Sequence, residues 1–140
     1  MKLQTGTLIQ PGSTGQADIT LPADFDPKAI LLWSAPMASD GGTGEAEFGM
    51  GIGTYRGSVV QQGYVAFSSA DVFTTSSVSL AMNTSSLLRT LTTNTSTTDL
   101  EIDLVSMTSG AASKVTIDWV NLMTNASIRV HYLILGGSDL

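Results

Sequence analysis

Apolar and polar residues alternate along most of this chain with a period of two. At this spacing the side chains of an extended strand return to the same face. The alternation is clearest in Leu3–Ile9, Leu100–Leu104, Val115–Trp119 and Ile128–Ile134. Turn signals such as Pro11-Gly12 separate the runs, and no stretch carries a helical stripe with caps. Short strands with frequent turns predict an all-β fold, a single antiparallel β-sandwich.

The other expected strands are shorter or less regular. The sequence predicts that Ala17–Leu21 forms a hairpin with Leu3–Ile9, and that Lys28–Ser34 is a central strand. Glu45–Thr54 and Ser58–Ser68 are expected to form a second hairpin. Between Ser68 and Thr98 we expect two short strands, Val78–Met82 and Leu87–Leu91, joined by long loops. A length of 140 residues is typical of one domain, so residues 1–140 are assigned to a single sandwich.

Composition limits what such a domain can bind. The chain has no cysteine, a formal net charge of −6 and only six Lys and Arg, which are scattered. This argues against nucleic-acid or membrane-surface binding, because both depend on clustered basic residues. No apolar run is long enough to span a membrane, and the N-terminus lacks the apolar core of a signal peptide. We therefore expect synthesis in a cytoplasm, from which the protein would reach any exterior by another route.

A run of alternating glycines is the most unusual local feature. Gly49, Gly51 and Gly53 alternate with large apolar residues from Phe48 to Ile52. The run does not fit a nucleotide-binding loop, since the third glycine, the following helix and the G-K-[ST] pattern are all missing. A glycine face in a strand indicates that something packs closely against it. We expect this face to be an interface.

The neighbouring loop is the second candidate interface. Residues Ala35–Gly44 hold Pro36, Asp40 and several glycines, which together are the clearest loop signal in the chain. We expect this loop, or the N-terminal strand, to reach a binding partner, with Pro36 and Asp40 as candidate contact residues.

Residues able to do chemistry are present but not in a catalytic pattern. His131 is the only histidine, and no G-x-S-x-G elbow accompanies it. Asp99, Glu101 and Asp103 fall on one strand face and could bind calcium, but a solvated face offset by Lys114 is the simpler interpretation. Carboxylates for glycoside hydrolysis exist, as in any acidic chain. We expect no enzyme, no cofactor and no metal.

The aromatic residues suggest at most a shallow binding site. Trp33, Phe48, Tyr64, Phe67, Trp119 and Tyr132 mostly fall in alternating runs and are expected in the core. Tyr55 lies beside Arg56 at a predicted turn and is the best candidate for an exposed aromatic residue. Tyr55 and Arg56 are therefore the expected ligand-facing pair if the domain binds a carbohydrate.

Two stretches resemble a known class of proteins. The first is A-D-I-T-L-P at residues 17–22 followed by F-D-P-K-A-I at 25–30. The second is V-T-I-D-W at 115–119 followed by I-R-V-H-Y-L-I-L-G-G at 128–137. Together they resemble small virion proteins of tailed bacteriophages. The same order is similar to the H-type lectin fold, an antiparallel sandwich that assembles as trimers and hexamers.

The resemblance implies a structural role in a phage particle. It favours a capsid decoration, or cement, protein that binds the outside of the head as a homotrimer and holds neighbouring major capsid proteins together. The alternative is a lectin-like, carbohydrate-binding module of a tail fibre or host-recognition spike. A small glycosidase is the third candidate, without a nucleophile–base pair in the sequence to support it.

Overall fold

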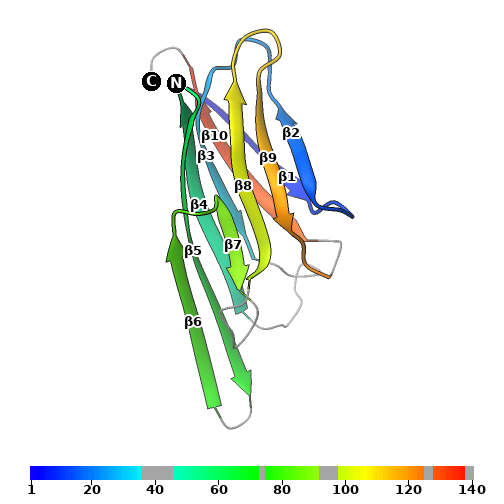
Figure 1. Ribbon diagram of the computed structural model, residues 1–140, viewed down its shortest axis with the longest axis vertical. Coiled ribbons are helices and arrows are strands. Elements are labelled where there is room, and N and C mark those ends of the chain that lie inside the picture. The colour runs from blue at the N-terminus through cyan, green and yellow to red at the C-terminus, as the bar shows by residue number, and fades with distance from the viewer. Residues whose placement is uncertain (36–45, 73–74, 92–97, 125–127, 138–140) are drawn as a thin grey trace.

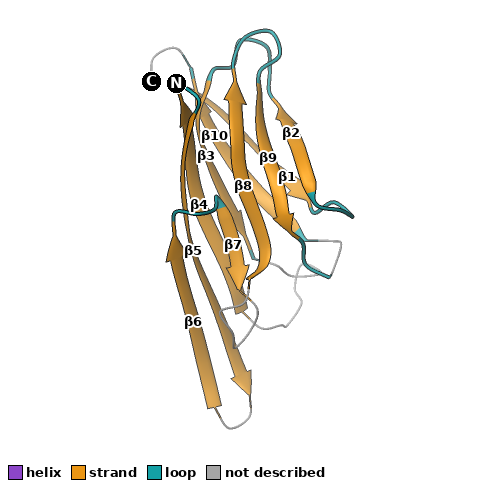
Figure 2. Ribbon diagram, in the orientation of Figure 1, coloured by secondary structure: helices purple, strands orange, loops and turns teal. Residues whose placement is uncertain are grey.

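A computed structural model describes residues 1–35, 46–72, 75–91, 98–124 and 128–137 of the chain (Figure 1). These residues form ten strands and no helix (Figure 2). The strands are β1 Lys2–Ile9, β2 Gly15–Thr20, β3 Pro27–Ser34, β4 Ala46–Arg56, β5 Val59–Val72, β6 Thr75–Asn83, β7 Leu88–Leu91, β8 Thr98–Thr108, β9 Lys114–Asn121 and β10 Arg129–Gly136.

The strands form two antiparallel sheets that pack face to face. The larger sheet has six strands in the order β1-β10-β3-β4-β5-β6, and the smaller has four in the order β2-β9-β8-β7. The predicted all-β antiparallel sandwich is therefore confirmed. In Figure 1 the hairpin of β5 and β6 projects beyond the end of the smaller sheet, so the larger sheet is only partly covered on its inner side.

A large hydrophobic core fills most of the space between the sheets, and a second, smaller cluster contains Tyr64, Ala66 and Leu91. Alternate residues of β3, including Ile30 and Leu32, point inward and are fully buried. They meet Leu104, Ile117 and Trp119 from β8 and β9 of the smaller sheet. In β8 and β9 the buried residues are those of the period-two pattern that predicted these strands, whereas β3 was predicted from a continuous apolar run that did not distinguish its two faces.

Of the two predicted hairpins, one is confirmed and one is wrong. Lys28–Ser34 lies centrally between β10 and β4, and the hairpin of β4 with β5 forms. The first two strands do not form the predicted hairpin, because β1 pairs with β10 and β2 pairs with β9. The segment between them crosses from one sheet to the other. Turn residues between two strands therefore marked a change of sheet instead of a hairpin.

Candidate functional site: the outer face of the larger sheet

The face of the six-stranded sheet that points away from the core carries two continuous rows of side chains. Residues directly opposite each other in antiparallel strands share a face. The register therefore aligns one row from β1 to β6, made of Thr7, His131, Trp33, Met50, Val65 and Met82. The next row runs through Thr5, Leu133, Leu31, Ile52 and Gly63. Neither row contains an Asp, Glu, Lys or Arg.

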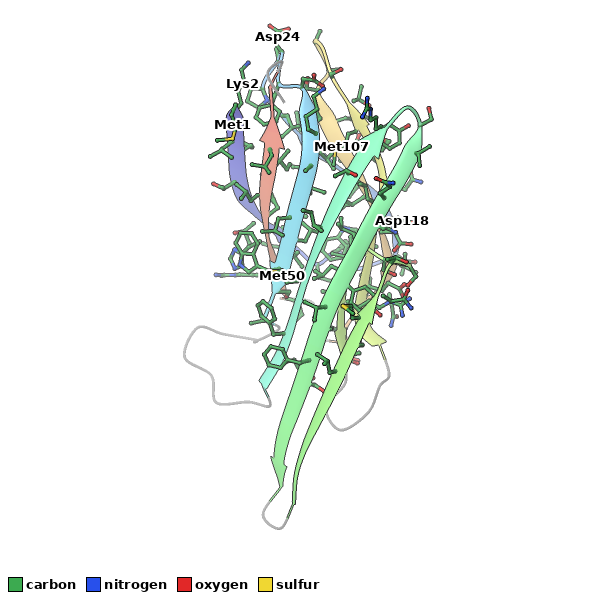
Figure 3. All side chains as sticks on the ribbon, turned by 90° about the vertical axis from the view of Figure 1, so that its left-hand side faces the viewer. Met1, Lys2, Asp24, Met50, Met107 and Asp118 are labelled. Carbon is green, nitrogen blue, oxygen red and sulfur yellow. The ribbon has the colours of Figure 1, made fainter. Side chains whose placement is uncertain are left out.

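Large apolar side chains on this surface remain in contact with solvent. Ile52 is 53% exposed and Met50 39%, while Leu80 and Met82 on β6 are 74% and 81% exposed. Phe48 stacks obliquely on Phe67 with 5.5 Å between ring centroids, beside these rows. Figure 3 looks onto this sheet, with Met50 labelled near its centre. We call the set Leu31, Trp33, Phe48, Met50, Ile52, Val65, Phe67 and Leu133 the outer apolar face.

An apolar hollow lies in the middle of this surface. It has a volume of about 370 Å³ and is lined by Leu31, Met50, Ile52, Val65 and Met82 around the backbone of Gly63. Gly63 provides no side chain at a position where its neighbours across the sheet carry large ones. A hollow of this kind fits an apolar side chain from another molecule.

His131 is the one ionisable group in the two rows, and it is packed into them. Its ring stacks on Trp33 with 5.7 Å between centroids. Its Nδ1 lies 2.9 Å from the Thr7 hydroxyl, so this nitrogen is hydrogen-bonded within the sheet. The histidine is thus half-buried and held by its neighbours on both sides. Among the described residues, the ring of His131 contacts Thr7 and Trp33, and these contacts do not form a serine–histidine–carboxylate arrangement.

The glycine face predicted to be an interface lies inside the sandwich. A Cβ atom on Gly49 would lie 2.0 Å from the Arg89 carbonyl oxygen, and one on Gly51 only 1.6 Å from that of Leu87. A Cβ on Gly53 would meet the side chain of Leu87 at 2.8 Å. The close packing is confirmed, but the partner is the β7 segment of the same chain. The available surface is therefore the opposite face of β4, formed by the residues between the glycines.

A charged cluster fixes β7 above these glycines. The Arg89 guanidinium forms an ion pair with the Glu101 carboxylate, and Arg89 also lies 5.5 Å from the ring centroid of Tyr64. Burial opposes the charged form of Arg89, yet its pKa is raised because the hydrogen bond and charge of Glu101 outweigh that cost. Ser86 donates a further hydrogen bond to Glu101. The cluster is structural, since its groups satisfy one another.

The expected offset of the acidic strand by Lys114 is wrong. Lys114 pairs with Asp18 on β2, with 2.7 Å between Nζ and Oδ2, and this pair lowers the pKa of Asp18 together with a hydrogen bond from Thr116. Asp103 is instead left with an unpartnered buried oxygen, and burial raises its pKa. Among the described residues, no group of three or more His, Cys, Asp or Glu side chains is arranged to hold a metal ion.

The candidate ligand-facing pair lies at the end of the β4–β5 hairpin. Tyr55 packs partly against the core, whereas Arg56 is exposed. Both line a hollow of about 700 Å³ that also includes Asp26, Lys28 and Ser109. Asp26 and Lys28 form an ion pair of 2.7 Å at its rim. The structure thus places a carboxylate, a guanidinium and hydroxyl groups around Tyr55.

Pro36 and Asp40 lie outside the described residues, together with most of the loop to which they belong. In the part of the chain that is described, no helix is long and apolar enough to cross a membrane. Comparisons with family models, with curated proteins and with solved structures found no match to this chain.

Sequence reasoning missed the outer apolar face because it assigned most of the aromatic residues to the core. Trp119 and Tyr64 are indeed buried, but Trp33 is only half-buried and Phe67 is 39% exposed on the outer side. The signal was present in β3, where K-A-I-L-L-W-S is apolar at successive positions. A strand that is apolar on both faces predicts contact on both faces.

Proposed function

We propose that this protein is a capsid decoration protein of a tailed bacteriophage, which binds the outside of the head as a homotrimer and stabilises the shell. The observation that carries the proposal is the outer apolar face. It is broad, contains no Asp, Glu, Lys or Arg in its central rows, and lies opposite the face that forms the core. The resemblance of both ends of the chain to phage virion proteins supports the same assignment.

Other copies of this chain are the best occupant for the outer apolar face. Permanent interfaces between identical subunits are more apolar than the surfaces of proteins that associate and separate. A decoration protein must also stay soluble before it meets the shell, which favours covering such a face within the trimer. Contact with the major capsid protein is then left to the trimer's remaining surfaces, with the Ala35–Gly44 loop and the N-terminal strand as our candidates.

The stabilising role follows from binding equilibria. A protein that binds only the assembled shell lowers the free energy of that state and not of the free subunits. A trimer engages several sites at once, so weak individual contacts combine into firm attachment. No chemistry is required for either effect.

The proposal is tested by mixing the purified protein with expanded phage heads assembled without it. We expect the protein to cosediment with the heads in multiples of three and to raise the temperature at which they rupture. Ile52→Lys, which places a charge in the apolar face, should prevent both effects, whereas Val120→Lys on the smaller sheet should not. Failure of the wild-type protein to bind the heads would reject the proposal.

A carbohydrate-binding module is the second candidate, favoured by the hollow at Tyr55 and Arg56. Its mixture of an aromatic ring, a carboxylate and polar groups suits the hydroxyls of a sugar. This candidate predicts binding to glycans or host cells that is lost in Tyr55→Ala and kept in Ile52→Lys. If the wild-type protein binds neither glycan arrays nor host cells, the carbohydrate-binding candidate is rejected.

A further inference from the structure

Among the described strands, the larger sheet ends at β6, which has a neighbouring strand on one side only. β6 pairs only with β5 among the described strands, so the N–H and C=O groups along its other edge have no partner within the sheet. The strand is nine residues long and reads T-S-S-V-S-L-A-M-N. It contains no charged residue, no proline and no glycine. Sheet edges of this kind are open to strands from another molecule.

The other three sheet edges differ from β6 in ways that discourage pairing. β1 begins at Lys2 and contains Gly6. β2 carries Asp18, which is held in an ion pair with Lys114 of β9. β7 has only four residues, one of them Arg89. Charged side chains, proline and short length are among the devices by which natural proteins protect their edges. Among these four edge strands, β6 alone lacks such devices and is therefore the best candidate for pairing with another molecule.

We infer that β6 pairs with β6 of a second copy of this chain, antiparallel and about a two-fold axis. A two-fold contact must be complementary to itself, and an antiparallel strand pair meets this condition automatically. The chain carries a net charge of −6, which opposes self-association, yet the edge itself contributes no charge to that repulsion. Two copies can therefore approach each other along this edge without charge repulsion at the contact itself.

The side chains on β6 fit this arrangement. Leu80 lies opposite Phe67 and Met82 opposite Val65, so both belong to the outer face of the sheet. They are 74% and 81% exposed, more than the other large apolar residues described on the outer face. When a β6 residue lies directly opposite its own copy at the two-fold axis, Leu80 and Met82 of both copies lie on the same face of the joined sheet. Each copy then covers the exposed side chains of the other.

This contact is separate from the face that we propose for the trimer. A three-fold assembly requires a different, heterologous contact, so a two-fold pair at β6 would join one trimer to the next. The hairpin of β5 and β6 projects beyond the smaller sheet and leaves its edge accessible for this purpose (Figure 1). The inference concerns the sheet edge alone and holds whatever larger particle contains the protein.

Sedimentation velocity of the full-length protein over rising concentration tests the inference. We expect the basic unit to double, and Leu80→Lys to weaken the doubling at least about tenfold while the basic unit persists. Leu3→Lys is the matched control, because Leu3 is also exposed on an edge strand of the same face. A wild-type protein that never doubles up to about 1 mM would overturn the inference.

The basic unit reports on the trimer separately. If it is a monomer that doubles, the proposed trimer fails and the β6 contact stands. If it is a trimer that never doubles, the trimer stands and the β6 contact fails. These two results cannot be confused, because each gives a different mass.

Cysteine cross-linking provides a readout that does not depend on lysine variants. The chain has no cysteine, so single substitutions from Ser77→Cys to Met82→Cys report only on contacts between copies. Residues close to a two-fold axis meet their own copy at disulfide distance, whereas more distant ones do not. We expect one position, or two neighbours on the same face, to oxidise to dimers faster than Leu3→Cys. Rates no faster than Leu3→Cys at all six positions would contradict the pairing.

Discussion

At the scale of single residues, the glycines of β4 have the least freedom to change. Gly51 faces the Leu87 carbonyl at a distance that leaves no room for a methyl group. Because the obstacle is backbone and not the end of a flexible side chain, it cannot move aside without displacing β7. These glycines therefore set how closely the two sheets approach.

Gly51→Ala should destabilise the fold by about 3 kcal/mol or more, because overpacking against backbone forces the sheets apart. Urea unfolding followed by circular dichroism measures the change. Gly12→Ala is the control, since a Cβ there meets no atom within 4 Å. Equal midpoints for the two variants would show that β7 does not pack on β4 as described.

The ion pair of Arg89 and Glu101 is partly buried, with side chains 25% and 15% exposed. Arg89→Met should cost about 2 kcal/mol, because it leaves the Glu101 carboxylate desolvated without its cation. The double variant with Glu101→Gln should lose clearly less than the sum of the two single changes. Strictly additive losses in chemical unfolding would mean that the two side chains do not act together.

Asp103 gives the fold a dependence on pH. Burial raises its folded-state pKa above the ordinary 3.8, so the folded state binds this proton more tightly than the unfolded chain. The resulting stability is complete below the ordinary pKa and is lost as pH rises through the raised value.

Asp103→Asn removes that loss. The variant should therefore be more stable than wild type at about pH 7, by less than about 1 kcal/mol because solvent screens the side chain. The gain should disappear near pH 3, where the wild-type carboxyl is also protonated. Melting curves at both pH values measure this, and a gain that is equal at the two would contradict the assignment to ionisation.

At the scale of elements, β3 and β4 each serve two surfaces. The inner residues of β3 contribute to the core, and the inner glycines of β4 allow β7 to pack closely. The outer residues of both strands form part of the outer apolar face. A substitution on the outer side should therefore change association and leave folding almost untouched.

Met50→Ser and Ile52→Ser together test this separation. We expect the melting temperature of the dilute protein to change by no more than a few degrees, in keeping with exposed positions. The mass measured by light scattering should fall from trimer to monomer. A large loss of thermal stability with an unchanged mass would show that these residues belong to the core.

The sequence predicted the strands better than it predicted their partners. Alternation in Val115–Trp119 and in Ile128–Ile134 identified β9 and β10, because period-two burial is a local property. Pairing depends on contacts far apart along the chain, so β1 was assigned to β2 when its partner is β10.

The candidate site was predicted only in part, for a similar reason. Alternation in Gly49–Gly53 correctly indicated that one face is closely packed, but it could not say which molecule packs there. That answer comes from β7, a segment far along the chain. The outer apolar face depends on how residues of several strands align, and this register is not readable from any single stretch.

At the scale of the whole molecule, the sandwich presents surfaces of different character. One face of the larger sheet is apolar and without charge in its central rows, whereas the smaller sheet carries ion-paired residues such as Asp18 and Lys114. Among the described strands, β6 ends the larger sheet, and there a second copy of the chain could extend the sheet. Such an arrangement is suited to assembly, which the proposed decoration role requires.

Electron cryomicroscopy of expanded phage heads, assembled without this protein and then incubated with it, tests the proposed function most directly. We predict added density on the outer surface at three-fold positions. In each trimer the outer apolar faces should lie against one another, with Ile52 buried. Heads without added density, or density in which that face points into solvent, would contradict the account.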